Sequence, residues 1–220
     1  MLNKIKNFIQ EIKDKRTYKK GIQKLDEGYY KEAEEILSGL EDSQLIDREM
    51  LFFNLGGALI GQDKLPEGEK YLHRAIEIES EHDYIWATLA EVNLLQRKWD
   101  EAEKAINKAI EIEPEKDFYE LKKEVICGSD ELKENYLKHF ELLKEAIEEQ
   151  KNENWEKSIE LLKESSEYYS KTGYIYNQIG AIYNNNLGNS DLAAQFFKKA
   201  IEKEPDNEIF QRNLKQVLKK

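Results

Sequence analysis

The stretch "RKWDEAEKAINKAIEIEPE", residues 97–115, decides the fold of this chain. Ala102, Ile106 and Ala109 are spaced as neighbours on one face of a helix, and Pro114 stands where a proline would stop that helix. The pattern returns in four looser forms: "GYYKEAEEILSGLED" (28–42), "DKLPEGEKYLHRAIEIESE" (63–81), "ENWEKSIELLKESSE" (153–167) and "NSDLAAQFFKKAIEKEPD" (189–206). Five copies of one helical pattern indicate an internal repeat.

Small residues set the register of this repeat. One small anchor stands in each copy: Ala33, Gly68, Ala102, Ser158 and Ala193. The steps between anchors are 35, 34, 56 and 35 residues, so the long step suggests one shortened or replaced unit. Twelve residues before each anchor, or thirteen in the last copy, stands a second small residue: Gly21, Gly56, Ala90, Ala146 and Gly180. Antiparallel helices approach closely where side chains are small, so each unit is predicted to be a helical hairpin.

The third unit, residues 83–116, resembles the tetratricopeptide repeat, which has about 34 residues. The residues that carry the resemblance are Trp86, Leu89, Ala90, Asn93, Ala102, Ile106, Ala109 and Pro114. The second and last units keep the same register. The resemblance implies an all-α fold, a right-handed superhelical solenoid of antiparallel helix hairpins, with about five repeats, an irregular middle segment and terminal capping helices.

The repeats predict boundaries along the chain. We expect an N-terminal amphipathic helix at 1–13, then a first block at 14–127 with repeats at about 14–47, 49–82 and 83–116 and a helix at 117–127. A second block at 129–220 is expected to hold a long helix from 130, repeats at about 139–172 and 173–207, and a capping helix at 208–219. Helix 117–127 either covers the last hairpin of the first block or begins a flexible hinge at Gly128. A cover is favoured because the exposed end of a solenoid needs one.

Composition limits the classes of function. The formal net charge is −11, which argues against nucleic acid as a partner because phosphate binding needs clustered Lys and Arg. Cys127 is the only cysteine, so no intrachain disulfide can form, and a cytoplasmic location with a half-buried structural thiol is expected. No apolar run approaches the roughly 18 residues that a membrane-spanning helix needs.

The first 20 residues differ in charge from the rest of the chain. They hold seven basic residues against Glu11 and Asp14, a balance of +5, while the remainder carries −16. An apolar stripe runs beside the lysines, at Leu2, Ile5, Phe8, Ile9 and Ile12. Such a helix either covers the open side of the first hairpin, the favoured interpretation, or lies on a membrane surface.

The residues suggest no catalytic, metal or cofactor site, so the chain is expected not to be an enzyme. His73, His82 and His139 are separated in sequence and have no cysteine or carboxylate cluster at ligand spacing, so they are interpreted as solvated surface residues. The glycines of "LGG" fall inside helical repeat positions and do not form a phosphate-binding loop.

What remains for function is the concave surface. In the family that the chain resembles, defined positions of each first helix face this groove. Here they are Tyr18, Ile22, Phe53, Asn54, Tyr84, Thr88, Glu91, Leu143, Lys144, Asn177 and Gln178. Tyr18, Phe53 and Tyr84 are then either anchors for a partner, as aromatic residues often are, or packing between neighbouring helices.

Some relatives hold acidic peptide C-termini with a clamp of Lys, Asn and Arg at these positions. Only Asn54 matches that clamp, while Tyr18, Ile22, Tyr84 and Thr88 replace its other members. The resemblance therefore implies a non-enzymatic adaptor or scaffold for another protein or peptide partner. The alternative is an assembly factor at the membrane surface.

Overall fold

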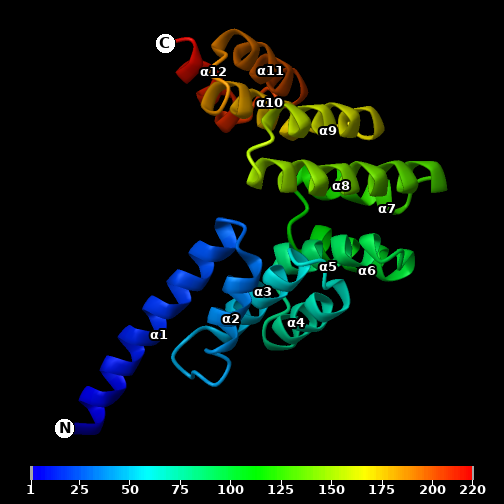
Figure 1. Cartoon of the computed structure of the whole chain (residues 1–220). Helices are drawn as coiled ribbons and strands as arrows, with labels where there is room; N and C mark the ends of the chain where they lie inside the picture. The colour runs from blue at the N-terminus through cyan, green and yellow to red at the C-terminus, as the bar shows by residue number, and fades with distance from the viewer. Residues whose placement is uncertain (1, 220) are drawn as a thin grey trace. The chain divides into compact units, whose positions relative to one another are not determined.

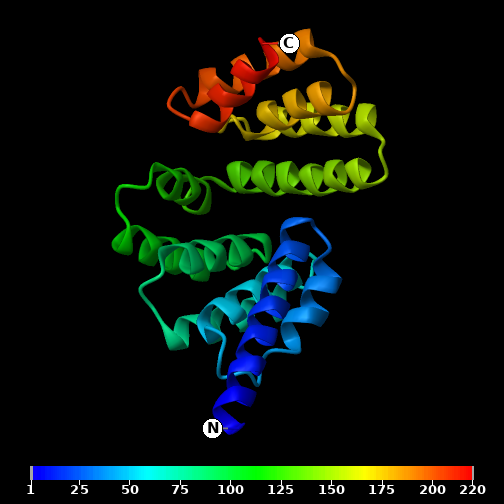
Figure 2. The same cartoon turned by 90° about the vertical axis from the view of Figure 1, so that its left-hand side faces the viewer.

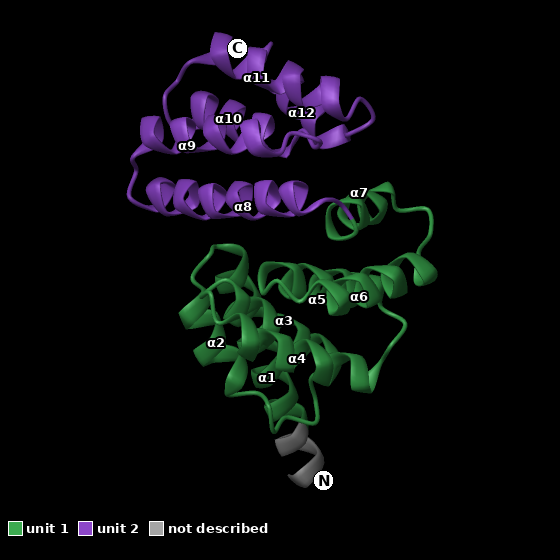
Figure 3. Cartoon of the chain, turned by 90° about the vertical axis from the view of Figure 1, so that its right-hand side faces the viewer, with its two compact units in different colours: residues 1–127 green, residues 128–220 purple. Residues whose placement is uncertain are grey.

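The computed structural model describes the backbone of residues 2–219 and the side chains of residues 8–219. Within that range it contains twelve α-helices and no strand, which confirms the all-α prediction. The chain divides into two compact units, residues 1–127 and residues 128–220 (Figure 3). Each unit is considered by itself below.

The unit of residues 1–127 contains seven helices (Figures 1 and 2). They are α1 (Leu2–Asp26), α2 (Tyr30–Ser38), α3 (Arg48–Ile60), α4 (Leu65–Ile78), α5 (Asp83–Leu95), α6 (Trp99–Ile112) and α7 (Asp117–Ile126). The helices α1 and α2, α3 and α4, and α5 and α6 pack as hairpins. Each hairpin also packs against the next one along the chain, and α7 packs against α6.

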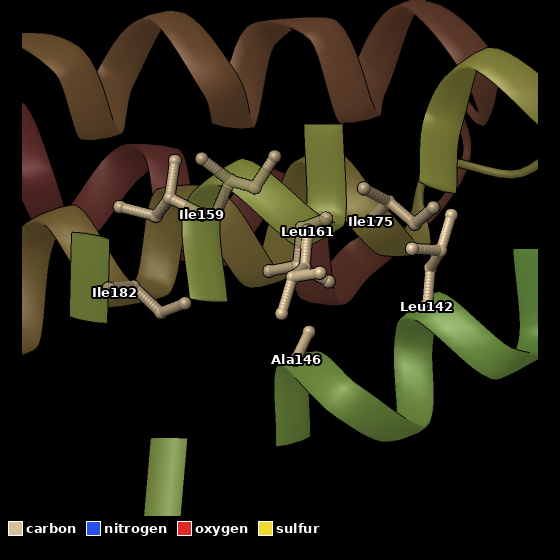
Figure 4. Packing of buried hydrophobic residues seen from close by; sticks show 8 residues of the cluster. Leu142, Ala146, Ile159, Leu161, Ile175 and Ile182 are labelled. Atoms are coloured by element: carbon tan, nitrogen blue, oxygen red, sulfur yellow. The ribbon is translucent and has the colours of Figure 1, made fainter. Parts of the chain in front are cut away.

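The unit of residues 128–220 contains five helices. They are α8 (Asp130–Lys151), α9 (Trp155–Tyr168), α10 (Tyr174–Asn185), α11 (Ser190–Lys203) and α12 (Glu208–Val217). Its core brings together side chains from α8, α9 and α10, and Figure 4 shows them converging between the helices. The labelled residues are Leu142, Ala146, Ile159, Leu161, Ile175 and Ile182.

The small residues lie where paired helices approach most closely. All ten positions that set the repeat register are buried. A Cβ atom added to Gly68 of α4 would lie 2.7 Å from Ile60 Cγ1 and 3.0 Å from Gly56 O of α3. A Cβ atom on Gly180 of α10 would lie 2.8 Å from the Phe197 ring of α11. Close packing therefore explains why these positions hold Gly, Ala or Ser.

The turn inside every hairpin contains one residue in the left-handed backbone region. These residues are Gly28 (φ 78°), Asp63 (φ 65°), Arg97 (φ 61°), Glu153 (φ 60°) and Gly188 (φ 63°). Each one lies five residues before the small anchor of its repeat. Glycine adopts this conformation without steric cost, whereas the three other residues have a Cβ that is crowded there.

Ser158 and Ser165 of α9 stand where the third repeat has Ala102 and Ala109, and both serines have hydrogen-bond partners. Gln150 Nε2 donates to Ser158 Oγ at 3.1 Å, and Ser165 Oγ donates to His139 O at 2.9 Å. The expectation of a solvated His139 was wrong, because this side chain is buried between α8 and α9. Its Nδ1 lies 3.0 Å from Ser165 Oγ, and the Tyr169 ring stacks edge-on against it. The serine supplies a polar partner that alanine would lack.

The first helix differs from the expected boundary at residue 13. α1 continues without a break to Asp26, because it contains no proline and its one glycine, Gly21, packs closely against Leu37 of α2. Gln10 and Asp14 bond across one turn at 2.7 Å. The expected stripe residues Leu2 and Ile5 lie outside the described side chains. Phe8, Ile9 and Ile12 are exposed, so they do not cover the first hairpin.

Candidate peptide-binding face

The predicted site residues of the first unit come from three neighbouring helices. Tyr18 and Ile22 lie on α1, Phe53 and Asn54 on α3, and Tyr84, Thr88 and Glu91 on α5. Six of these side chains are half-buried and Asn54 is buried, at 8% exposure. These three helices are the first helices of three successive hairpins. The seven residues therefore come from the same part of three neighbouring repeats. We refer to these seven residues as the first-helix face.

A hydrogen bond joins α1 to α3 within the first-helix face. Asn54 Nδ2 donates to Tyr18 Oη at 2.8 Å and to the Met50 carbonyl oxygen at 2.6 Å. Burial raises the pKa of Tyr18, and the nearby carboxylate of Asp47 also raises it, while the bond from Asn54 partly opposes them. The phenol therefore stays neutral at physiological pH. The Asn54 amide is engaged inside the fold rather than held ready for a carboxylate ligand.

Two aromatic rings join α3 to α5. The Phe53 and Tyr84 ring centroids are 5.1 Å apart and the rings are inclined at 73°, an edge-to-face contact. Tyr84 Oη donates to the Met50 sulfur at 3.1 Å, and the His82 ring lies 5.3 Å from the Tyr84 ring. Burial raises the pKa of Tyr84, and the charges of Glu49, Asp47 and Asp83 add to the increase. Several negatively charged carboxylates therefore lie near this phenol.

The polar residues of α5 are also satisfied within the unit. Thr88 Oγ1 donates to the Tyr84 carbonyl oxygen at 2.7 Å, one turn earlier on the same helix. Glu91 accepts a hydrogen bond from Lys122 of α7 and forms an ion pair with it. The surface left to a ligand on the first-helix face is therefore largely ring and aliphatic carbon.

A carboxylate at the start of α5 fastens α7 to the unit. Asp83 accepts hydrogen bonds from Lys116 and from Tyr119 of α7. Burial alone would raise the pKa of Asp83, but these two donors outweigh it and lower the pKa. Burial and the bond to Asp83 raise the pKa of Tyr119 to about 12.

The four remaining predicted site residues lie in the second unit. Leu143 packs at the edge of its core and Lys144 is exposed, both on α8. On α10, Asn177 Oδ1 accepts from Asn213 of α12 at 2.8 Å, and Gln178 Nε2 donates to Tyr174 Oη at 2.7 Å. The structure thus divides the eleven predicted residues into two sets, seven in one unit and four in the other.

Three residues that bond to first helices were missed from the sequence. Lys122, Tyr119 and Asn213 each bond to a first helix one hairpin away. Sequence spacing offers a signal for such contacts, because three hydrogen-bonded pairs share one separation of 36 residues. They are Tyr18–Asn54, Asp83–Tyr119 and Asn177–Asn213. A search for polar pairs 36 residues apart would have found Tyr119 and Asn213, but not Lys122, which lies 31 residues from Glu91.

Other expected chemistry can be compared with the described residues. Among residues 8–219, no group of three or more His, Cys, Asp or Glu side chains is arranged to hold a metal ion. Cys127 is exposed, so the expectation of a half-buried thiol was wrong, because the residue follows the last turn of α7. In the part of the chain that the structure describes, no helix has the length and apolarity to cross a membrane.

Comparison with known families agrees with this architecture. Residues 59–125 match one tetratricopeptide repeat family model, and residues 173–207 match a second. The chain therefore contains tetratricopeptide repeats in both units, as its sequence predicted. Proteins of this class are generally non-enzymatic scaffolds.

Solved structures similar to this chain include TTC0263, described as a thermophilic tetratricopeptide repeat protein in Thermus thermophilus. It has 13% identity and a TM-score of 0.49, covering 94% of this chain and 100% of its own. MamA from AMB-1 has 18% identity and a TM-score of 0.44, with coverage of 89% and 93%. The tetratricopeptide domain of P58(IPK) has 17% identity and a TM-score of 0.47, with coverage of 94% and 65%. Comparison with curated protein sequences gives no match.

Proposed function

We propose that the first unit binds a peptide segment of a partner protein on the first-helix face. The observation that carries the proposal is the Phe53–Tyr84 ring pair, which links α3 to α5 while both rings remain half-exposed. Aromatic side chains held rigidly at a surface lose little conformational entropy on binding and are enriched among interface hot spots.

The chemistry of the face favours an apolar peptide with basic residues. The amide of Asn54, the hydroxyl of Thr88 and the carboxylate of Glu91 all have partners within the unit. Asp47 and Glu49 lie close enough to raise the pKa of Tyr84, so the local potential is negative. A negative potential attracts Lys or Arg and repels a peptide carboxylate.

The proposal extends to a second contact surface in residues 128–220. There the half-exposed Tyr174 ring and the amides of Asn177 and Gln178 lie together on α10, with Leu143 and Lys144 on α8. Side-chain amides can donate to and accept from an extended peptide backbone.

In this account the protein is a cytoplasmic adaptor that works without catalysis or a cofactor. The general scaffold role of tetratricopeptide repeat proteins supports the adaptor function. The single cysteine supports a reducing compartment, since structural disulfides are rare there.

A random peptide library displayed on phage tests the proposed face without a known partner. Peptides are selected on the full chain and then titrated against two variants. Thr88→Lys places a long cation on the first-helix face, whereas Thr17→Lys is the matched control. Thr17 Oγ1 also donates to a carbonyl oxygen one turn earlier, but it lies about 100° from Tyr18 around α1.

Selected peptides should bind the wild type and Thr17→Lys equally and should bind Thr88→Lys at least about tenfold more weakly. Melting curves of both variants establish that they are folded. Peptides that bind Thr88→Lys as tightly as the wild type would place the binding surface elsewhere.

A further inference from the structure

The exposed side of α1 has a composition unlike that of a solvated helix. Phe8 is 62% exposed, Ile9 60% and Ile12 38%. Ile9 directly follows Phe8, and Ile12 comes three residues after Ile9 and four after Phe8, so the three side chains form one continuous stripe. Figure 1 shows this part of α1 extending beyond α2 and α3. We call Phe8, Ile9 and Ile12 the α1 stripe.

The α1 stripe faces away from the unit to which α1 belongs. Asp14 is buried and accepts hydrogen bonds from Gln10 at 2.7 Å and from Ser43 at 2.6 Å, which fixes the inner side of the helix. Gly21 is also on the inner side, where an added Cβ would lie 2.6 Å from Leu37 Cδ2 of α2. At 100° per residue, Gly21 is about 180° around the helix from Ile12. The stripe is therefore on the opposite side from the packed surface.

Basic residues surround and continue the α1 stripe. Arg16 and Lys19 come four and seven residues after Ile12, on the same side of the helix. The cations that surround the stripe, all exposed, are Lys13, Lys15, Arg16, Lys19 and Lys20. Among the described residues, only Lys15 of this group has an ion pair, with Glu11 at 2.7 Å. The remaining cations are free to meet an external negative charge.

We infer that the α1 stripe and its cations dock on an anionic lipid surface. Apolar side chains flanked by lysine and arginine are the pattern of a helix that lies in the plane of a membrane interface. The apolar residues enter the acyl boundary while the cations meet lipid phosphates. A bilayer accepts a single protruding stripe, whereas a protein partner would need a matching apolar groove. This inference is independent of the proposed peptide-binding face.

Flotation of the full chain with lipid vesicles tests the inference. One set of vesicles is phosphatidylcholine alone, and the other is three parts phosphatidylcholine to one part phosphatidylglycerol. Ile9→Asp removes apolar contact, and its control Ile78→Asp makes the same change at an exposed isoleucine of α4. Arg16→Glu with Lys19→Glu removes the cations. Its control, Lys70→Glu with Lys104→Glu, makes the same change in net charge at exposed positions of α4 and α6.

The wild type and both controls should float with the anionic vesicles and not with phosphatidylcholine alone. Ile9→Asp and Arg16→Glu with Lys19→Glu should each weaken binding by about tenfold or more, and added salt should weaken the wild type. The altered side chains are exposed, so circular dichroism should show all variants folded. Failure of the wild type to float, or equal flotation of Ile9→Asp, would overturn the inference.

Two further results would assign α1 to another partner. Binding to duplex DNA that depends on Arg16 and Lys19 but not on Ile9 would indicate a nucleic-acid contact instead. A concentration-dependent dimer in solution that Ile9→Asp abolishes, without vesicle binding, would indicate that the stripe docks on a second copy.

Discussion

The Phe53 and Tyr84 rings meet edge to face, with centroids 5.1 Å apart, and thereby connect two successive repeats. The same rings are half-exposed on the face that we propose for peptide binding. Packing between repeats and ligand contact thus use one set of side chains. Substitutions there are expected to affect both properties, and experiments must measure the two separately.

The small anchors should be intolerant of large side chains. Ala102→Arg or Ala193→Arg should lower the free energy of unfolding by several kcal/mol, because overpacking alone costs about 1–3 kcal/mol and a buried charge adds to that cost. Both residues are fully buried. Glu103→Arg, at the exposed neighbouring position, is the control and should change stability little. Thermal melts of Ala102→Arg or Ala193→Arg within a degree of the wild type would refute the hairpin register.

Substitutions at the left-handed turn residues should change stability only through the backbone conformation that each residue must adopt. A Cβ added to Gly188 would have no atom within 4 Å, so Gly188→Ala introduces no clash, yet it should cost about 1 kcal/mol because of its φ of 63°. Glu153→Gly should stabilise the chain by up to about 1 kcal/mol. Gly39→Ala is the control, since Gly39 has a φ of −63°, and urea denaturation should show no loss of stability there. Equal effects at Gly39 and Gly188 would contradict the backbone explanation.

Asp83 should contribute stability that depends on pH. Its pKa is lowered in the folded state, so its contribution is present above the ordinary pKa of about 3.9 and is lost as pH falls through the folded value. Asp83→Asn should therefore cost about 1–2 kcal/mol at neutral pH and less at about pH 3. Urea denaturation at the two pH values measures the difference. A cost that does not change with pH would show that the ionised carboxylate is not what fastens α7.

The segment that joins the two units should be the first site of proteolysis. We propose that Gly128 marks a block boundary, and Cys127, Gly128 and Ser129 connect α7 to α8 outside both helices. Linking segments open more readily than packed hairpins. Limited digestion with mass spectrometry should find early cuts at 127–131. Early cuts within 49–116 would argue against the boundary.

Much of the fold could be predicted because close helix packing leaves a mark on the sequence. Gly56 and Gly68 are small since each backbone touches the other helix, and the same need recurs in every repeat. The left-handed positions could not be predicted in the same way. Two of the five hold Arg97 and Glu153, whose side chains give no sign of a positive φ.

The candidate site was less accessible to sequence reasoning. Repeat position placed Tyr18, Phe53 and Tyr84 on neighbouring first helices, but it did not show that the Asn54 amide bonds to Tyr18. The burial of His139 depends on Ser165 in the facing helix, a pair 26 residues apart. Side-chain partners between helices are tertiary contacts, and a single helix pattern does not encode them.

The most direct test of the central claim measures peptide affinity and stability together for Phe53→Ala and Tyr84→Ala. A peptide selected on the wild type is titrated at a temperature where the folded fraction of each variant is known. If the first-helix face binds the peptide, each variant should lose about 2 kcal/mol of binding free energy per folded molecule, whatever its change in melting temperature. Lower melting temperatures with unchanged affinity per folded molecule would show that these rings only pack the repeats together.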